Sequence, residues 1–192
     1  MNDVLSKIEL RSKLRKQRAK LSHAELIIAE QGIAYHASKS MRLLQAKRIA
    51  SYAPFAGEAS PDLLLKRLRY TSVFLPKIVN FHLKKMAFYP ASNHSHANKY
   101  GIDEPHTGAK QVFCNRFDVI LLPLLAFDRT GTRMGMGAGY YDRALQALTH
   151  QTSTKPYLIG IAHHFQEVTK IKRESWDIPL DAILTDHEFI HL

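Results

Sequence analysis

The sequence contains one cysteine, Cys114, among 192 residues. A single thiol excludes an intramolecular disulfide, so the fold depends on its hydrophobic core, and a chain of this length can bury a sufficient one. Such low cysteine usage is common in proteins of a reducing compartment, and we expect a cytoplasmic location.

Long hydrophobic runs are also absent. The longest extends from Val119 to Phe127 and contains Pro123, whereas a membrane span needs about 20 apolar residues. Charged residues recur from Asp3 onward, which leaves no apolar core for a secretory signal. We therefore expect no membrane association.

Acidic residues are scarce relative to basic ones. The chain has 27 Lys and Arg against 17 Asp and Glu, a formal net charge of +10. Excess positive charge attracts acidic partners over long range, and the candidates are nucleic acid, a nucleotide or a polyanionic small molecule. Composition does not choose between them, and a basic surface that is only solvated is an equal alternative.

The remaining composition is that of an ordinary globular protein, with 45% hydrophobic and 23% charged residues. We expect one domain over residues 1–192. Helical spacing predicts basic N-terminal helices, one over residues 3–20 and a second that Ser22 and Glu25 open with a capping box and that extends to about Leu44. The start signal at residues 60–62 predicts a further helix to about Arg69.

Short β-prone segments alternate with these helices. We predict strands at 48–53, 71–75, 86–89, 118–122, 157–162 and 182–184, a helix at 140–149 and a long surface loop at 91–116. Such alternation is typical of the α/β class, with a mainly parallel central sheet and helices on both faces. Ligands bind beyond the carboxyl ends of parallel strands, which is where the loop after strand 118–122 lies.

Four of the nine glycines cluster in DRTGTRMGMGAGYYDR, at positions 131, 135, 137 and 139. Closely spaced glycines allow positive φ and a close approach of backbone N–H groups to an anion. The helix that follows and Arg133 would both favour phosphate oxygens. The spacing matches neither the P-loop nor the dinucleotide-binding fingerprint, so an ordinary turn is an alternative to a phosphate site.

Asp142 lies just inside the helix after this loop. An acid at that position interacts favourably with the helix dipole. It would equally serve as a Mg²⁺ ligand, because magnesium in phosphate sites takes one or two carboxylates together with phosphate oxygens. The spacing alone leaves both roles open.

RMGMGAGYYDR, preceded by LLPLLAFDRTG, resembles the signature of the 5-formyltetrahydrofolate cyclo-ligases, also called 5,10-methenyltetrahydrofolate synthetases. The resemblance covers nearly the whole chain, since KIELRSKLRKQRAKLS, SYAPFAGE, FLPKI, YGIDEP and IPLDAILTD follow in the family's order. It implies a ligase that uses ATP and Mg²⁺ to close 5-formyltetrahydrofolate into 5,10-methenyltetrahydrofolate. The reaction releases ADP and phosphate and proceeds through phosphorylation of the formyl oxygen.

The resemblance also implies site residues. Those for ATP are Lys7, Ile8, Glu9, Leu10, Arg11, Arg133, Met134, Gly135, Met136, Gly137, Ala138, Gly139, Tyr140 and Tyr141, with Arg133 as the catalytic cation. Those for the folate are Ala53, Glu58, Met136, Gly137, Ala138, Gly139 and Tyr140. Asp142 and Asp181 match the metal ligands. Without the resemblance, Lys7 and Arg11 would be a solvated helix face, the tyrosines core packing, Glu58 a loop acid and Asp181 a turn residue.

One position departs from a pattern seen in part of the family. Some members carry lysine at the position of Ala138, where it reaches the transferring phosphate. The alanine leaves open which cation replaces it. Lys77 in FLPKI is a candidate, or else only a surface lysine at a strand end. Gln166 is expected to border the nucleotide.

Eleven histidines are present, including His94 with His96, the pair at 163–164, and His187 with His191. None of these groups matches an established zinc ligand set. We therefore expect ordinary surface or core histidines.

Two other functions stay open. A basic nucleic-acid-binding module led by the N-terminal helix would explain the charge but would leave the glycine-rich loop unused. A nucleotide- or sugar-phosphate-dependent enzyme on the same fold would use the loop for different chemistry. Under the folate hypothesis the partners are ATP and 5-formyltetrahydrofolate, whose acidic polyglutamate tail would meet the basic surface. We then expect a monomer that binds no nucleic acid.

Overall fold

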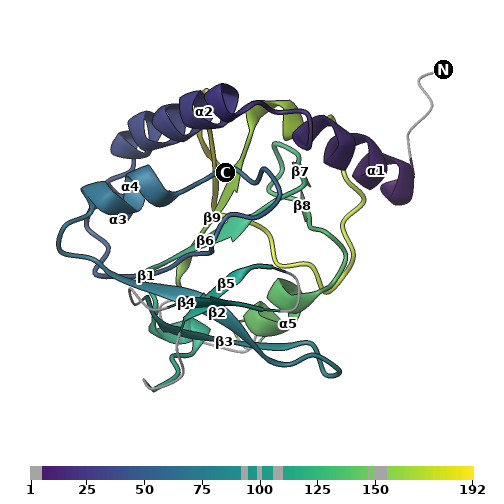
Figure 1. The fold of residues 1–192 in the computed structure, drawn as a ribbon. Coiled ribbons are helices and arrows are strands. Elements are labelled where there is room, and N and C mark those ends of the chain that lie inside the picture. Colours follow the sequence, from purple (N-terminus) through teal and green to yellow (C-terminus); the bar gives the residue numbers. More distant parts are fainter. Residues whose placement is uncertain (1–5, 92–94, 99–100, 106–109, 147, 149–154) are drawn as a thin grey trace.

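The computed structural model describes residues 6–91, 95–98, 101–105, 110–146, 148 and 155–192. At its centre lies a seven-stranded sheet with the order β11-β10-β9-β6-β1-β2-β3 (Figure 1). Neighbours from β10 to β2 are parallel, while the edge strands β11 and β3 are antiparallel to theirs. The strands are β1 (Arg48–Ala50), β2 (Ser72–Asn80), β3 (Lys85–Pro90), β6 (Val119–Pro123), β9 (Tyr157–Ala162), β10 (Ala182–Thr185) and β11 (Phe189–His191).

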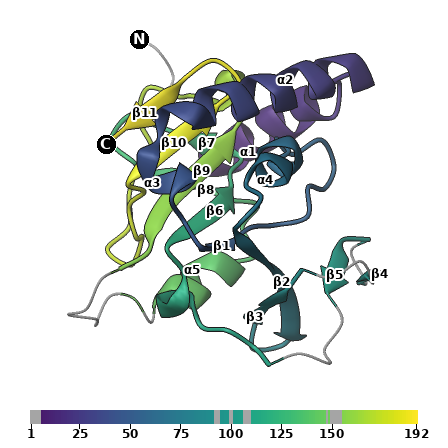
Figure 2. The same ribbon diagram turned by 90° about the vertical axis from the view of Figure 1, so that its left-hand side faces the viewer.

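Helices flank both faces of the sheet (Figures 1 and 2). On one face, Ile33 of α2 (His23–His36) packs in one buried cluster with Leu121; α3 (Met41–Leu44) and α4 (Asp62–Arg67) contribute to the same cluster. On the other face, Leu145 of α5 (Tyr140–Gln146) packs in a second cluster with Ile120. Adjacent residues of β6 thus point to opposite faces, as strand geometry requires. The predicted α/β class with a mainly parallel, helix-flanked sheet is confirmed.

The first helix, α1 (Lys7–Arg18), packs beside the sheet rather than on it. Ser6 caps it, and Leu14 contributes to a third buried cluster with Leu125 and Met134. This contact holds α1 against the segment that follows β6. No helix among the described residues is both long enough and apolar enough to cross a membrane.

The second predicted helix is wrong in its length. α2 ends at His36, a short 3-10 turn covers Ala37–Lys39, and α3 begins after Ser40. Ser40 has extended backbone dihedrals, and its hydroxyl accepts a hydrogen bond from the Leu43 N–H at 3.3 Å. Because serine readily caps the start of a new helix, Ser40 separates α2 from α3, whereas the hydrophobic spacing alone predicted one continuous helix.

Several strands also differ from the prediction. β2 continues past Pro76 to Asn80, which is tolerated because β2 beyond Phe74 pairs with β3 alone. The predicted loop at 91–116 contains a small antiparallel pair, β4 (Ser95–Ala97) with β5 (Asp103–Pro105). The edge strand β11 was not predicted. The start of the glycine-rich loop forms a strand, β8 (Arg133–Met134), paired with β7 (Ala126–Phe127).

Strand order creates a crevice at one edge of the sheet. β1 lies between β2, which follows it in the chain, and β6, to which the chain returns later. The connections after β1 and β6 therefore leave the sheet in different directions, and ligands of open α/β sheets bind at such switch points. This position agrees with the expectation drawn from the loop after strand 118–122.

Candidate active site

A cavity of about 690 Å³ lies at the carboxyl ends of β1 and β6. Tyr52 and Ala53, just after β1, form part of its wall, and Pro123 and Leu124 at the end of β6 form another. The glycine-rich segment 133–142, residues of α1, and Glu174, Trp176 and Asp177 form further parts of the wall. The cavity therefore joins pieces of chain that are far apart in the sequence.

The glycine-rich loop connects β8 to α5 along this cavity. Gly137 and Gly139 have backbone φ values of +96° and +74°, which residues other than glycine rarely adopt. Arg11 of α1 donates from Nε to the carbonyl of Gly135 at 3.2 Å. The conformation of the loop therefore requires glycine at positions 137 and 139. The hydrogen bond from Arg11 connects the loop to α1.

Arg133 is the central cation of the loop. Its side chain is 8% exposed, and its Nη2 lies 2.7 Å from Oδ1 of Asp142. Its Nη1 donates to the carbonyl of Ile178. Burial lowers the pKa of Arg133, while the charges of Asp142 and Asp177 act in the opposite direction. The guanidinium is thereby held in the cavity wall by Asp142 and the Ile178 carbonyl.

The second predicted metal ligand, Asp181, does not lie with Asp142. Asp181 is exposed and absent from the cavity wall, and its Oδ2 accepts a hydrogen bond from the Leu158 N–H at 2.8 Å. Leu158 lies near the start of β9, whereas the cavity is at the carboxyl ends of the strands. An aspartate four residues earlier, Asp177, does line the cavity, and its carboxylate accepts a hydrogen bond from the Glu174 N–H at 2.8 Å.

The cavity wall also contains a buried ion pair. Glu58 accepts a hydrogen bond from the Phe55 N–H at 3.2 Å, and its Oε1 lies 3.6 Å from Nη1 of Arg18. Burial raises the pKa of Glu58, and the charge of Arg18 opposes this shift. Ala53 lines the same cavity. A carboxylate held in such a pocket can accept hydrogen bonds from N–H groups of a flat heterocycle.

The predicted segment 7–11 of α1 contributes only part of its residues. Lys7 and Arg11 line the cavity, and Lys7 forms a 2.9 Å ion pair with Glu174. Ile8 is 77% exposed and away from the wall, while Glu9 closes the capping box with Ser6. Leu10 packs against the third buried cluster. Side chains that point away follow directly from helical periodicity.

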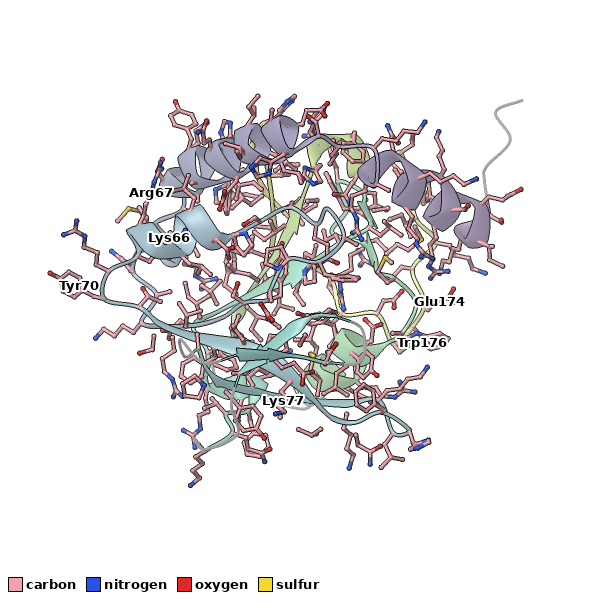
Figure 3. The ribbon with its side chains drawn as sticks, in the orientation of Figure 1. Lys66, Arg67, Tyr70, Lys77, Glu174 and Trp176 are labelled. Carbon is pink, nitrogen blue, oxygen red and sulfur yellow. The ribbon has the colours of Figure 1, made fainter. Side chains whose placement is uncertain are left out.

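All the predicted residues from Arg133 to Tyr141 line the cavity. Lys77 does not line the cavity, although its neighbours Pro76 and Ile78 do, because alternate residues of β2 face opposite sides of the strand. Figure 3 shows Lys77 away from Trp176, which lines the cavity. Gln166 is 1% exposed and donates to the carbonyls of Leu124 and Leu125 at 2.7 and 2.9 Å. It shapes the turn after β6 rather than facing the cavity.

The cavity wall also contains polar and aromatic residues that were not predicted, among them Arg18, Trp176 and Asp177. Arg18 is 3% exposed. Its sequence position indicated this, because it lies four residues after Leu14 and therefore on the same face of the helix. Trp176 is 67% exposed although it lines the cavity, so its indole lies at the mouth. Figure 3 shows Glu174 and Trp176 below the end of α1.

Two of the histidines, His164 and His187, form a group with Asp186 away from this wall. Oδ2 of Asp186 lies 2.9 Å from Nδ1 of His164 and 3.6 Å from Nε2 of His187. The two imidazole rings stack at 3.6 Å with planes 10° apart, so their in-plane lone pairs do not converge on one ion. His94 and the side chain of His96 lie outside the described residues.

Comparison with known proteins points to one family. A profile of the 5-formyltetrahydrofolate cyclo-ligase family matches residues 3–186. The 5-formyltetrahydrofolate cyclo-ligase of Haemophilus influenzae is 35% identical over 181 residues, covering 92% of this chain and 95% of that protein. The enzyme of the same name from Escherichia coli K12 is 36% identical over 148 residues, covering 74% of this chain and 80% of its own.

Solved structures agree with the sequence comparisons. A 5,10-methenyltetrahydrofolate synthetase from Mycoplasma pneumoniae superimposes with a TM-score of 0.74 at 26% identity, covering 95% of this chain and 99% of that one. The Aquifex aeolicus 5,10-methenyltetrahydrofolate synthetase gives a TM-score of 0.81 at 28% identity, covering 97% and 93%.

Proposed function

This chain belongs to the 5-formyltetrahydrofolate cyclo-ligase family and is an enzyme of that family, and we propose that it closes its folate by moving the γ-phosphoryl group of ATP to the formyl oxygen. The bond from the γ-phosphorus to ADP breaks as a bond to the formyl oxygen forms. N10 then attacks the formyl carbon and loses its proton, and the phosphate leaves with the former formyl oxygen.

The observation that carries this proposal is that one cavity is lined by two groups of different chemistry. The glycine-rich loop, Arg133, Asp142 and Asp177 form one group, which we assign as the phosphate end, and the buried Glu58–Arg18 pair forms the other. The first suits a triphosphate and the second suits a pterin with several N–H groups. A single cavity brings the phosphoryl donor and the folate acceptor together, and most of the catalysis of phosphoryl transfer is positioning and charge neutralisation.

At the phosphate end, backbone N–H groups of Gly135–Gly139 would bind phosphate oxygens, and Arg133 would stabilise the charge of the moving phosphoryl group. Lys7 and Arg11 would bind the remaining phosphates from α1. Since Lys7 already pairs with Glu174, this lysine would exchange the Glu174 carboxylate for a phosphate group when ATP binds.

Asp142 and Asp177 fit a Mg²⁺ ion that binds together with ATP. Both line the phosphate end, and magnesium in such sites takes one or two carboxylates plus phosphate oxygens. When bound, the ion would neutralise phosphate charge. Asp181 lies near the start of β9, outside the cavity, so we assign Asp177 as the second carboxylate ligand.

Trp176 is suited to hold the base of the nucleotide. Its indole is largely exposed at the mouth of the cavity, one residue before Asp177. An exposed aromatic plane beside a phosphate site offers a stacking surface for a nucleobase. The pterin would instead meet Ala53 and Glu58, together with the loop residues from Met136 to Tyr140 that line the same cavity.

The direct test is an assay of the purified protein with 5-formyltetrahydrofolate, ATP and Mg²⁺, following the near-ultraviolet absorbance of the methenyl product in acidic buffer. We expect a rise that requires both ATP and Mg²⁺. Product formed equally well without ATP would refute the proposed role of the glycine-rich loop, and confirmed ATP binding without product would indicate other chemistry on this fold.

A further inference from the structure

Arg18, the last residue of α1, is buried in the cavity wall with unused hydrogen-bonding capacity. Arg18 is 3% exposed, and its Nε donates to the carbonyl of Ala56 at 3.0 Å. Its Nη1 is buried and has no hydrogen-bond partner. A buried donor that forms no hydrogen bond is costly, and the 3.6 Å ion pair with Glu58 offsets only part of this cost, so an oxygen atom of a ligand would be a favourable further acceptor.

The neighbours of Arg18 place it between Glu58 and the glycine-rich loop. Nη1 lies 3.6 Å from Oε1 of Glu58. Nη2 lies 3.9 Å from the sulfur of Met136, in the glycine-rich loop. Under the proposed function Glu58 meets the pterin and the loop binds ATP, so the guanidinium would lie close to both the formyl oxygen and the γ-phosphate.

We propose that Arg18 is a further catalytic residue, whose Nη1 donates to the formyl oxygen and then to the phosphoryl group that this oxygen receives. This inference rests on the proposed function. It also answers which cation stands near the transferred group in a chain with alanine at position 138. Arg18 keeps its protons throughout, and it exchanges no bond with the substrates.

The charge of the acceptor predicts where Arg18 acts. The formyl oxygen is neutral before transfer, whereas the phosphorylated oxygen carries a negative group. A fixed cation therefore binds the transition state and the phosphorylated intermediate more strongly than the substrate, which raises kcat rather than affinity. If Arg18 only held Glu58 in place, its loss would instead weaken folate binding.

The test compares Arg18→Gln with Arg15→Gln, which removes the same charge from an exposed position of the same helix. For Arg18→Gln we expect kcat to fall by about 100-fold or more, with the Kd of 5-formyltetrahydrofolate, measured by calorimetry without ATP, changed only a few-fold. Arg15→Gln should match the unaltered protein. If Arg18→Gln fails to fold, Arg18→Lys replaces it and should show a smaller loss confined to kcat.

A double-mutant cycle separates this role from a purely positioning one. In a Glu58→Gln background, Arg18→Gln should still lower kcat by a similar factor. A loss that vanishes in that background, a weaker Kd with unchanged kcat, or an unchanged kcat in the Arg18 variants would each overturn the inference. The unaltered protein is assayed alongside, so absence of ATP-dependent product there would instead refute the proposed function.

Discussion

At the scale of single residues, two aspartates four positions apart have different surroundings. Asp177 lines the cavity beside Arg133, whereas Asp181 holds the N–H of Leu158 at the opposite end of the strands. The sequence alone favoured Asp181 because it lies in a recognisable tail. Which of two nearby acids faces the cavity depends on the path of the backbone after β9, and that path has no local signature.

Magnesium titrations of three variants test this assignment. We expect Asp177→Asn and Asp142→Asn to raise the Mg²⁺ concentration needed for half-maximal rate, because each removes one anionic ligand. Asp181→Asn should leave the titration unchanged, since an amide oxygen can still accept from Leu158. The opposite pattern, with only Asp181→Asn affected, would restore the sequence-based assignment.

Trp176 offers a second test at this scale, because it is the only tryptophan in the sequence. Its intrinsic fluorescence should change saturably when ATP is added, since stacking alters the environment of the indole. Trp176→Ala should weaken ATP binding by about 1–3 kcal/mol, the usual contribution of base–aromatic stacking, and Trp176→Phe should retain most of it. An ATP dissociation constant that is the same in the alanine variant would exclude the base from this surface.

At the scale of elements, the strands of the central sheet other than β11 were predictable, and the two short pairs outside it were not. β6 and β9 are continuous apolar runs, typical of strands covered on both sides. The pairs β4–β5 and β7–β8 are only two or three residues long and depend on partners across a turn. In the same way, Arg18 contacts Met136, a residue 118 positions away in the sequence.

The glycine-rich loop is the element whose conformation bears most on ATP. Gly137→Ala would force a side chain into a φ of +96°, at a cost of about 1–2 kcal/mol, which should appear as weaker ATP binding. Gly135 has no neighbouring atom within 4 Å of an added Cβ and no positive φ, so Gly135→Ala should cost less. Equal effects in calorimetric titrations would show that conformation is not the reason for glycine at position 137.

At the scale of the whole molecule, stability should depend on pH through Asp128. This residue is fully buried at the base of the turn before β8. Burial would raise its pKa, but hydrogen bonds from Thr130, Thr132 and Ile171 outweigh that effect, so its pKa is lowered. A carboxyl with a lowered folded-state pKa stabilises the fold above its unfolded-state pKa, and this stabilisation is lost as pH falls through the folded-state value.

Asp128→Asn should therefore destabilise the protein at neutral pH by about 1.5–3 kcal/mol, because its amide N–H group would face the Ile171 N–H in place of Oδ2. The difference in unfolding temperature between the two proteins should shrink as the pH falls below about 4. A difference that stays constant with pH would show that the charge of Asp128 does not contribute.

The measurement that tests the central claim most directly follows the formyl oxygen itself. 5-Formyltetrahydrofolate labelled with ¹⁸O in the formyl group is converted with unlabelled ATP in unlabelled water, and the inorganic phosphate is analysed by mass. Transfer of the phosphoryl group to the formyl oxygen predicts one ¹⁸O atom in each phosphate released. Unlabelled phosphate formed together with the methenyl product would contradict it, because the phosphoryl group would then have passed to another acceptor.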